Sequence, residues 1–282
     1  MKLFLSTLFL ADVALASCGG CDRAPHSPTS VPVGGITGGA PSVVPSTGGT
    51  PCRATINPSA KARVQRPKIV GGTVTPTGAQ PAAVALETAN GFAYCGGTLV
   101  GNRTVVTAAH CEARPGEFVA VGLNDLNQAG GRIAILEVRS SPDWAPDTMH
   151  ADWSVLVLEA SALSCPRTAP ARMVPVGWHP DVGAMFRVFG WGRTTQGGTA
   201  SDVLRQVDVP LADCSAYPGE ITNTMFCAGT PGKDSCQGDS GGGLYADGLL
   251  AGIVSWGEGC AGPKPGVYTN VGIVRADIDA CL

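Results

Sequence analysis

The sequence of 282 residues has few charged side chains and no hydrophobic run long enough to cross a membrane. Charged residues make up 15% of the chain, and the formal net charge is −3. This balance gives no electrostatic basis for binding nucleic acid or an anionic membrane, so neither is expected as a partner. The apolar stretch within residues 1–16 is shorter than the about 20 residues that a membrane-spanning helix needs.

The N-terminal quarter of the chain has the composition of targeting and linker segments. Residues 1–17 are predicted to form a signal peptide, because one lysine precedes a short apolar segment. Leu15-Ala16-Ser17-Cys18 resembles a bacterial lipobox, in which case Cys18 would be lipidated; ordinary cleavage near Ala16 is the alternative, and both stay open. Residues 18–68 are rich in Pro, Gly, Ser and Thr and are predicted to be a flexible tether and pro-segment. The protein is therefore expected to be secreted or, if Cys18 is lipidated, tethered to the outer surface with that lipid as its sole membrane contact.

The rest of the chain has the pattern of an all-β fold. Eleven cysteines indicate an oxidising compartment. Short strand-like segments are separated by turn residues at roughly even intervals. These segments are 82–87, 96–100, 117–121, 132–138, 153–158, 185–190, 203–209 and 249–255. Residues 271–282 place Val274, Ile278 and Cys281 on one helical face, which predicts a C-terminal helix.

Three distant residues have the chemistry of a nucleophilic site. Ser240 lies in a glycine-dense motif at residues 238–242 (GDSGG), whose flexible backbone can direct N–H groups at a developing oxyanion. His110 ends an apolar run and can shuttle a proton near neutral pH. Asp152 opens another apolar run, where its carboxylate would be partly buried and could hold the histidine tautomer. Their order along the chain is that of the chymotrypsin triad.

With these residues in place, the chain resembles the trypsin-like, chymotrypsin-fold serine peptidases. The matching motifs run in family order from about residue 69 to the end, and residues 1–68 lie outside the match. They are 69–72 (IVGG), 95–99 (CGGTL), 107–111 (TAAHC), Asp152, 190–192 (GWG), 238–242 (GDSGG), 255–257 (SWG) and 265–268 (PGVY). The resemblance implies two six-stranded antiparallel β-barrels with the site between them and a C-terminal α-helix, in a monomeric peptidase domain spanning residues 69–282.

The resemblance implies a role for each residue of the site. Ser240 would attack the scissile carbonyl, His110 would take and return its proton, and Asp152 would orient the imidazole. The N–H groups of Gly238 and Ser240 would form the oxyanion hole. An acyl-enzyme would form, and water would hydrolyse it.

The same resemblance implies a preference for basic side chains. Asp234, six residues before Ser240, would lie at the floor of the primary pocket, where a carboxylate selects Arg or Lys. Gly257 and Gly266 match the pocket walls. The other residues implied to bind substrate are Ser235 and Tyr217, which match pocket-lining positions, and Ser255 and Trp256, which with Gly257 match the edge strand that pairs with the substrate backbone. Polypeptides with Arg or Lys at the cut site are the expected substrates, and protein inhibitors are further candidate partners.

The bond between Lys68 and Ile69 resembles a zymogen junction. Cleavage would free the α-ammonium of Ile69, which in the family pairs with the aspartate before the nucleophile, here Asp239. Burying such a pair is costly unless both partners are present, so the uncut chain is expected to lack an ordered oxyanion hole. Two alternatives are a non-catalytic binding module of this fold, which the complete triad disfavours, and a peptidase of non-basic specificity, which Asp234 disfavours.

The resemblance also implies three disulfides and no metal. The pairs are Cys95–Cys111, Cys214–Cys227 and Cys236–Cys260, which leave Cys18, Cys21, Cys52, Cys165 and Cys281. Cys165–Cys281 would tie down the C-terminal helix, whereas Cys52–Cys165 would keep the pro-segment attached after activation; both stay open. No cofactor is expected. No zinc site is expected because the catalytic region lacks a compact Cys/His group, and no calcium site because the loop after Gly122 lacks the acidic cluster of trypsin.

Overall fold

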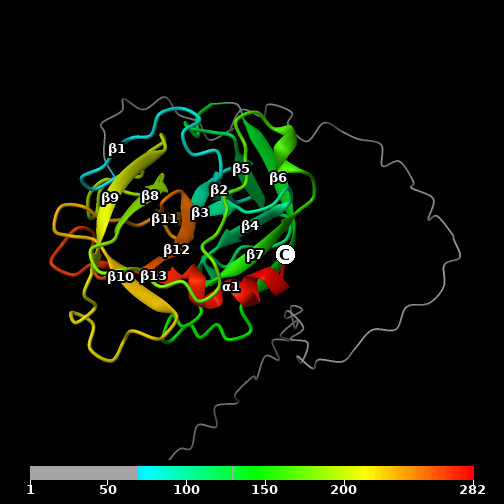
Figure 1. Cartoon of the computed structure of the whole chain (residues 1–282). Helices are drawn as coiled ribbons and strands as arrows, with labels where there is room; N and C mark the ends of the chain where they lie inside the picture. Colours follow the sequence, from blue (N-terminus) through cyan, green and yellow to red (C-terminus); the bar gives the residue numbers. More distant parts are fainter. Residues whose placement is uncertain (1–68, 129) are drawn as a thin grey trace, which may run out of the picture.

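The computed structural model describes residues 69–128 and 130–282. Six antiparallel strands close into a first barrel, with β2 followed around the ring by β3, β4, β7, β6 and β5. The strands are β2 (Ala83–Glu87), β3 (Ala93–Leu99), β4 (Thr104–Thr107), β5 (Phe118–Val121), β6 (Gly131–Ser140) and β7 (Ser154–Leu158). Figure 1 shows this barrel on the right of the molecule.

A second ring of six strands lies beside the first (Figure 1). Its order is β9-β10-β13-β12-β11-β8, and the pairing of β8 with β9 closes it. The strands are β8 (Met185–Gly190), β9 (Arg205–Ala212), β10 (Met225–Ala228), β11 (Gly243–Ala246), β12 (Leu249–Trp256) and β13 (Gly266–Asn270). The two-residue strand β1 (Thr73–Val74) adds to β9 and so ties the start of the described chain to this barrel.

The predicted double barrel with a C-terminal helix is confirmed, although four of the twelve barrel strands were missed. The segment predicted at 185–190 has the bounds of β8, where exposed Met185 and Arg187 alternate with buried Phe186 and Val188. The missed strands β4, β10, β11 and β13 have only four or five residues each. Strands this short are defined by pairing with neighbours across the barrel, because a few residues carry little alternation of their own.

Small side chains allow the two barrels to pack closely. Ala83 and Ala85 of β2 do not join the main core; they form a separate buried cluster with Trp191 and Leu204 from the second half of the chain. The neighbouring Val84 and Leu86 point the other way, into the main core. Because successive strand residues face opposite sides, β2 serves both the barrel interior and the contact between barrels.

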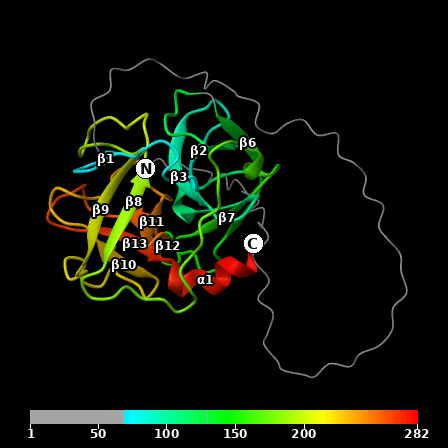
Figure 2. The ribbon, with the colours of Figure 1, turned by 45° about the horizontal axis from the view of Figure 1, so that its top comes forward.

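The helix α1 (Val271–Ala280) leads from the second barrel back to the first (Figure 2). The Asn270 side chain accepts a hydrogen bond from the Gly272 N–H at 2.9 Å and so caps the helix start. Val274, Ile278 and Cys281 are buried, in line with the predicted face, and Arg139 of β6 donates to the Cys281 carbonyl at 2.7 Å. None of the helices in the described part of the chain is long and apolar enough to cross a membrane.

Candidate active site

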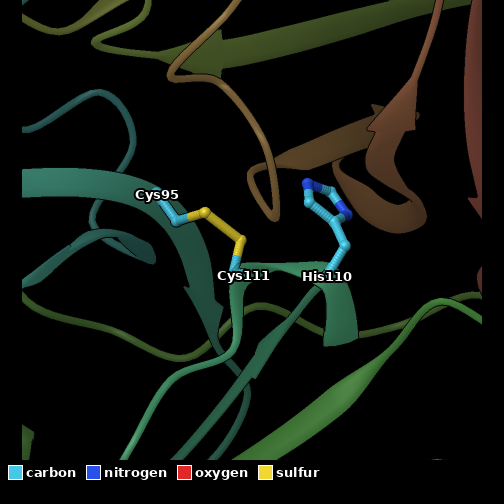
Figure 3. Close-up of side chains that lie close together, drawn as sticks. All are labelled: Cys95, His110 and Cys111. Carbon is cyan, nitrogen blue, oxygen red and sulfur yellow. A yellow bond between two sulfur atoms is a disulfide. The ribbon is translucent and has the colours of Figure 1, made fainter. Parts of the chain in front are cut away.

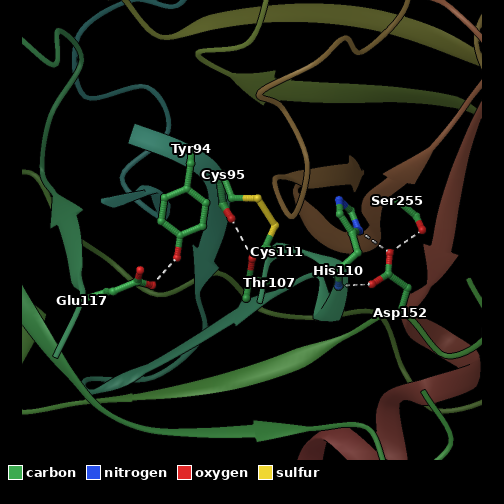
Figure 4. Close-up of a disulfide and its surroundings, with 9 residues drawn as sticks. Tyr94, Cys95, Thr107, His110, Cys111, Glu117, Asp152 and Ser255 are labelled. Atoms are coloured by element: carbon green, nitrogen blue, oxygen red, sulfur yellow. Dashed lines mark hydrogen bonds and ion pairs between the residues drawn. A yellow bond between two sulfur atoms is a disulfide. The ribbon is translucent and has the colours of Figure 1, made fainter. Parts of the chain in front are cut away.

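His110 lies where the end of β4 turns into the short 3-10 helix η1 (Ala109–Cys111). The Thr107 hydroxyl donates to the Gly96 carbonyl at 2.8 Å, and a disulfide joins Cys111 to Cys95 on the same neighbouring strand, β3. These contacts on both sides of His110 fix its main chain (Figure 4). The imidazole itself is 23% exposed, so it is held in place and still accessible to a substrate.

The Asp152 carboxylate is fully buried, not partly buried as predicted, and accepts three hydrogen bonds. Oδ1 accepts from the His110 backbone N–H at 2.9 Å, and Oδ2 lies 2.7 Å from His110 Nδ1. The Ser255 hydroxyl also donates to Oδ2 (Figure 4). A carboxylate can only accept in this arrangement, so His110 Nδ1 carries the proton and Nε2 is left as the basic atom.

Ser240 is placed beside this pair by contacts of its backbone. Its carbonyl accepts from the Gly96 N–H at 2.7 Å, next to the Cys95–Cys111 disulfide. Gly241 has φ +76°, and a Cβ there would lie 2.2 Å from Thr107 Oγ1, so only glycine allows this approach. Among the described residues, no hydrogen bond joins the Ser240 hydroxyl to His110. Catalytic contacts of this kind often tighten only when substrate binds.

Two backbone N–H groups lie in the turn that carries Ser240. Within the described part of the chain, neither the Gly238 nor the Ser240 N–H has a hydrogen-bond partner. Gly238 has φ +96°, which turns its peptide in a way that L-residues rarely allow. Two unpaired N–H groups flanking a candidate nucleophile can stabilise negative charge on an oxygen bound there.

Asp234, which was predicted to lie at the floor of a specificity pocket, is buried and 4% exposed. Oδ2 accepts from the Ala261 N–H at 3.0 Å, but Oδ1 is buried without a partner among the described residues. Burial raises the pKa of this carboxyl to about 6, although nearby hydrogen-bond donors, the Ala261 N–H among them, lower it. A Cβ at Gly266 would lie 2.7 Å from Oδ1, so glycine keeps this oxygen open. A buried carboxylate oxygen that lacks a hydrogen-bond donor among the described residues is suited to a cationic ligand.

Several other predicted substrate-binding residues lie close to Asp234 or contact one another. The Ser235 hydroxyl lies 3.0 Å from the Tyr268 hydroxyl, and buried Tyr217 donates to the Pro265 carbonyl at 2.8 Å. The Tyr217 ring meets the Trp256 ring edge-on, with centroids 4.9 Å apart. At Gly257 the nearest contact of an added Cβ would be 3.6 Å away, so this wall is less crowded than Gly266.

Asp239 is a fully buried carboxyl without a cationic partner in the described part of the chain. It accepts from the Gly192 N–H at 2.8 Å and from the Cys236 N–H at 2.9 Å. Burial raises its pKa to about 7, more than these hydrogen bonds lower it. A Cβ at Gly190 or Gly192 would lie within 2.5 Å of the carboxyl, so both glycines make room for it. The Ile69 side chain is also fully buried, whereas Lys68 lies outside the described residues.

Comparison with known proteins identifies the family. A family model described as Trypsin matches residues 69–277. The chain belongs to the trypsin family. "Serine protease 1" of Rattus norvegicus is 41% identical over 217 residues, covering 72% of this chain and 85% of that protein. "Trypsin" of Saccharopolyspora erythraea is 40% identical over 215 residues, covering 72% and 93%. "Trypsin 5G1" of Aedes aegypti is 37% identical over 219 residues, covering 74% and 82%. This trypsin-family chain is a serine endopeptidase, and its family acts on polypeptides.

The trypsin-family domain contains three disulfides between described residues, Cys95–Cys111, Cys214–Cys227 and Cys236–Cys260. Cys165 and Cys281 are disulfide-bonded as well, but the alternative Cys165–Cys281 is not among these three. Cys165 lies against Gly131 at the start of β6. The Cys281 carbonyl instead accepts a hydrogen bond from Arg139, near the other end of this ten-residue strand. Because a strand rises about 3.3 Å per residue, the two cysteines lie well apart, near opposite ends of β6. Cys18, Cys21 and Cys52 lie outside the described residues.

The catalytic region does hold a compact Cys/His group, contrary to the sequence-based argument against zinc. Potential ligand atoms of Cys95, His110 and Cys111 lie within 4.8 Å of one another (Figure 3). Both sulfur atoms are bonded to each other, and zinc is bound by thiolates. In this disulfide form, the group buttresses the histidine.

Sequence reasoning missed one functional contact of this trypsin-family site. Ser255 was assigned to substrate binding alone, but its buried hydroxyl donates to the Asp152 carboxylate. The two residues are 103 positions apart and come from different barrels, so no local pattern in the sequence could have paired them.

Proposed function

We propose that this serine endopeptidase cleaves polypeptides after Arg or Lys, with Ser240 as nucleophile, His110 as general base and Asp152 as its orienting anion. In the proposed reaction, His110 Nε2 takes the Ser240 proton as Oγ attacks the scissile carbonyl. The imidazolium that forms is stabilised by Asp152 Oδ2, 2.7 Å from Nδ1. The Gly238 and Ser240 N–H groups receive the oxyanion, His110 returns the proton to the leaving amine, and water hydrolyses the acyl-enzyme by the same steps.

The preference for Arg or Lys rests on one observation, the unpaired Oδ1 of buried Asp234. A guanidinium or ammonium group that reaches this oxygen replaces the hydrogen bonds that burial has removed. An aromatic or aliphatic side chain would leave the oxygen without a partner. Ser235, Tyr217, Trp256, Gly257 and Gly266 are proposed to line the substrate path, and the main chain of residues 255–257 to pair with the substrate backbone.

Amide substrates that differ only in the side chain before the cut test this specificity. We expect the activated enzyme to prefer Arg and Lys over Phe, and Asp234→Asn to lose most of that preference. Asp247→Asn, which neutralises an exposed loop carboxylate, is the matched control and should retain it. Equal rates for Phe and Arg substrates in the unchanged enzyme would contradict the proposal. Full biological effect from Ser240→Ala would favour a non-catalytic binding module instead.

We further propose that the chain is a secreted zymogen activated by cleavage between Lys68 and Ile69. The buried carboxyl of Asp239 has no cationic partner among the described residues and can accept the new α-ammonium of Ile69, which supports this proposal. Lys68→Ala should leave a folded but nearly inactive precursor after treatment with a trypsin-like enzyme. N-terminal sequencing and intact mass, before and after that treatment, would identify the cut site and show whether Cys18 carries lipid. Full activity of Lys68→Ala would contradict the switch.

A further inference from the structure

Two threonines of the second barrel hold the backbone around Asp152, although Asp152 belongs to the first barrel and comes just before β7. The Ala151 N–H donates to the Thr224 hydroxyl at 3.0 Å. The Thr269 hydroxyl donates to the Asp152 carbonyl at 2.9 Å. All four residues are buried. The two contacts bracket residues 151 and 152 and cross the boundary between the barrels.

The segment that Thr224 holds has an unfavourable backbone conformation. Ala151 has φ +52° and Met149 has φ +55°, both in the left-handed region that non-glycine residues seldom adopt. Such a conformation persists only where surrounding contacts impose it. The Trp153 N–H donates to the Ala151 carbonyl at 2.9 Å, so the turn at Ala151 also sets the direction in which the chain enters β7. A change at Ala151 would therefore redirect the Asp152 side chain.

The surroundings of Thr224 leave its oxygen available to accept. Its own proton can go to Thr222 Oγ1 at 3.0 Å or to His150 Nδ1 at 3.4 Å. Its carbonyl accepts from the Asn270 N–H at 2.8 Å, and the next residue, Met225, pairs with Thr269. The two threonines thus belong to one hydrogen-bonded unit of β10 and β13. Loss of the Thr224 hydroxyl would leave the buried Ala151 N–H without a partner.

We propose that Thr224 is a positioning residue for the reaction. By accepting the Ala151 N–H, it sets the turn that aims the Asp152 carboxylate at His110. This inference rests on the proposed role of Asp152 as the anion that stabilises the imidazolium. It makes the alignment of Asp152, a residue of the first barrel, dependent on a side chain of the second.

Thr224→Val tests this role, because valine has nearly the shape of threonine but no hydroxyl. In the activated enzyme we expect kcat for an Arg amide substrate to fall about tenfold, since small misplacements of catalytic groups are costly, with KM unchanged. The pH profile of kcat should change as well, because a displaced Asp152 stabilises the imidazolium less. The downfield proton NMR signal of His110 Nδ1–H should shift upfield or broaden. Thr224→Ser, which keeps the hydroxyl, should restore most of kcat.

Thr98→Val is the matched control, since it removes another buried hydroxyl, which lies 3.3 Å from that of Tyr245. This variant should have the same kcat and NMR signal as the unchanged enzyme. A Thr224→Val enzyme with lower thermal stability but unchanged kcat and NMR signal would overturn the positioning role. Equal impairment of Thr224→Ser and Thr224→Val would overturn it too. If Thr224→Val does not fold, Thr224→Ala carries the same test. If Asp152→Asn is inactive and Thr224→Val behaves like the unchanged enzyme, only this inference is refuted. If Asp152→Asn is fully active, the proposed triad itself is refuted.

Discussion

The stability of the uncut chain should fall as the pH rises toward neutrality, because of Asp239. This carboxyl is fully buried, and its pKa is raised from 3.8 to about 7. Between these values the folded chain keeps a proton that the unfolded chain releases. The stability from this protonation is therefore complete below about pH 4 and is lost as the pH rises to about 7. A shift of this size corresponds to about 4 kcal/mol, at about 1.4 kcal/mol per pKa unit.

Urea unfolding of the uncut Ser240→Ala chain between pH 4 and 8 would measure this effect, since that variant cannot cleave itself under the proposed mechanism. Asp239→Asn in the same background should flatten the pH profile of stability. The difference between the two profiles separates the effect of Asp239 from that of other carboxyls with a raised pKa, such as Asp234. Cleavage after Lys68 should also flatten it, because an ammonium partner lowers the pKa of Asp239. Parallel pH profiles for the uncut chain with and without Asp239→Asn would refute the reasoning.

Three further predictions concern single groups. Asp152→Asn should lower kcat roughly ten-thousandfold, as in triads of this kind, with little change in KM; steady-state kinetics showing less than a tenfold loss would contradict its role. Binding of a small aryl amidine, followed by calorimetry, should weaken as the pH falls through about 6, because protonation of Asp234 removes the charge that the amidine pairs with; pH-independent binding would count against that contact. Trp153→Ala should lower the free energy of unfolding by about 3–5 kcal/mol, since this side chain is 1% exposed and would leave a cavity; a loss below 1 kcal/mol in denaturant titration would show that the site collapses.

Residue chemistry carried by short motifs was readable from the sequence, whereas contacts between distant segments were not. Ser240, His110 and Asp152 stood out because each lies in a distinctive local context. Ser255 and Thr224 did not, because a serine or threonine on a strand has no local feature that names its partner 70 or more residues away. The full burial of Asp152 depends on the second barrel covering the first, which no pattern near residue 152 records.

The ends of helices and strands also could not be read from local sequence patterns alone. The helix was predicted through residue 282 but ends at Ala280, since the hydrophobic face indicates where a helix packs and not where its hydrogen bonds stop. The short strands β4 and β11 were missed, and their pairing with neighbouring strands in the barrels is what defines them.

The three disulfides between described residues each close a loop inside one half of the molecule, and none of the three bridges the halves. Asp152 and His110 lie on one side of that boundary, and Ser240 and Ser255 on the other. We therefore expect catalytic alignment to be lost before secondary structure, since a slight separation of the halves would inactivate the enzyme while both rings of strands stayed intact. Mild denaturant should abolish turnover well before circular dichroism registers any loss of sheet.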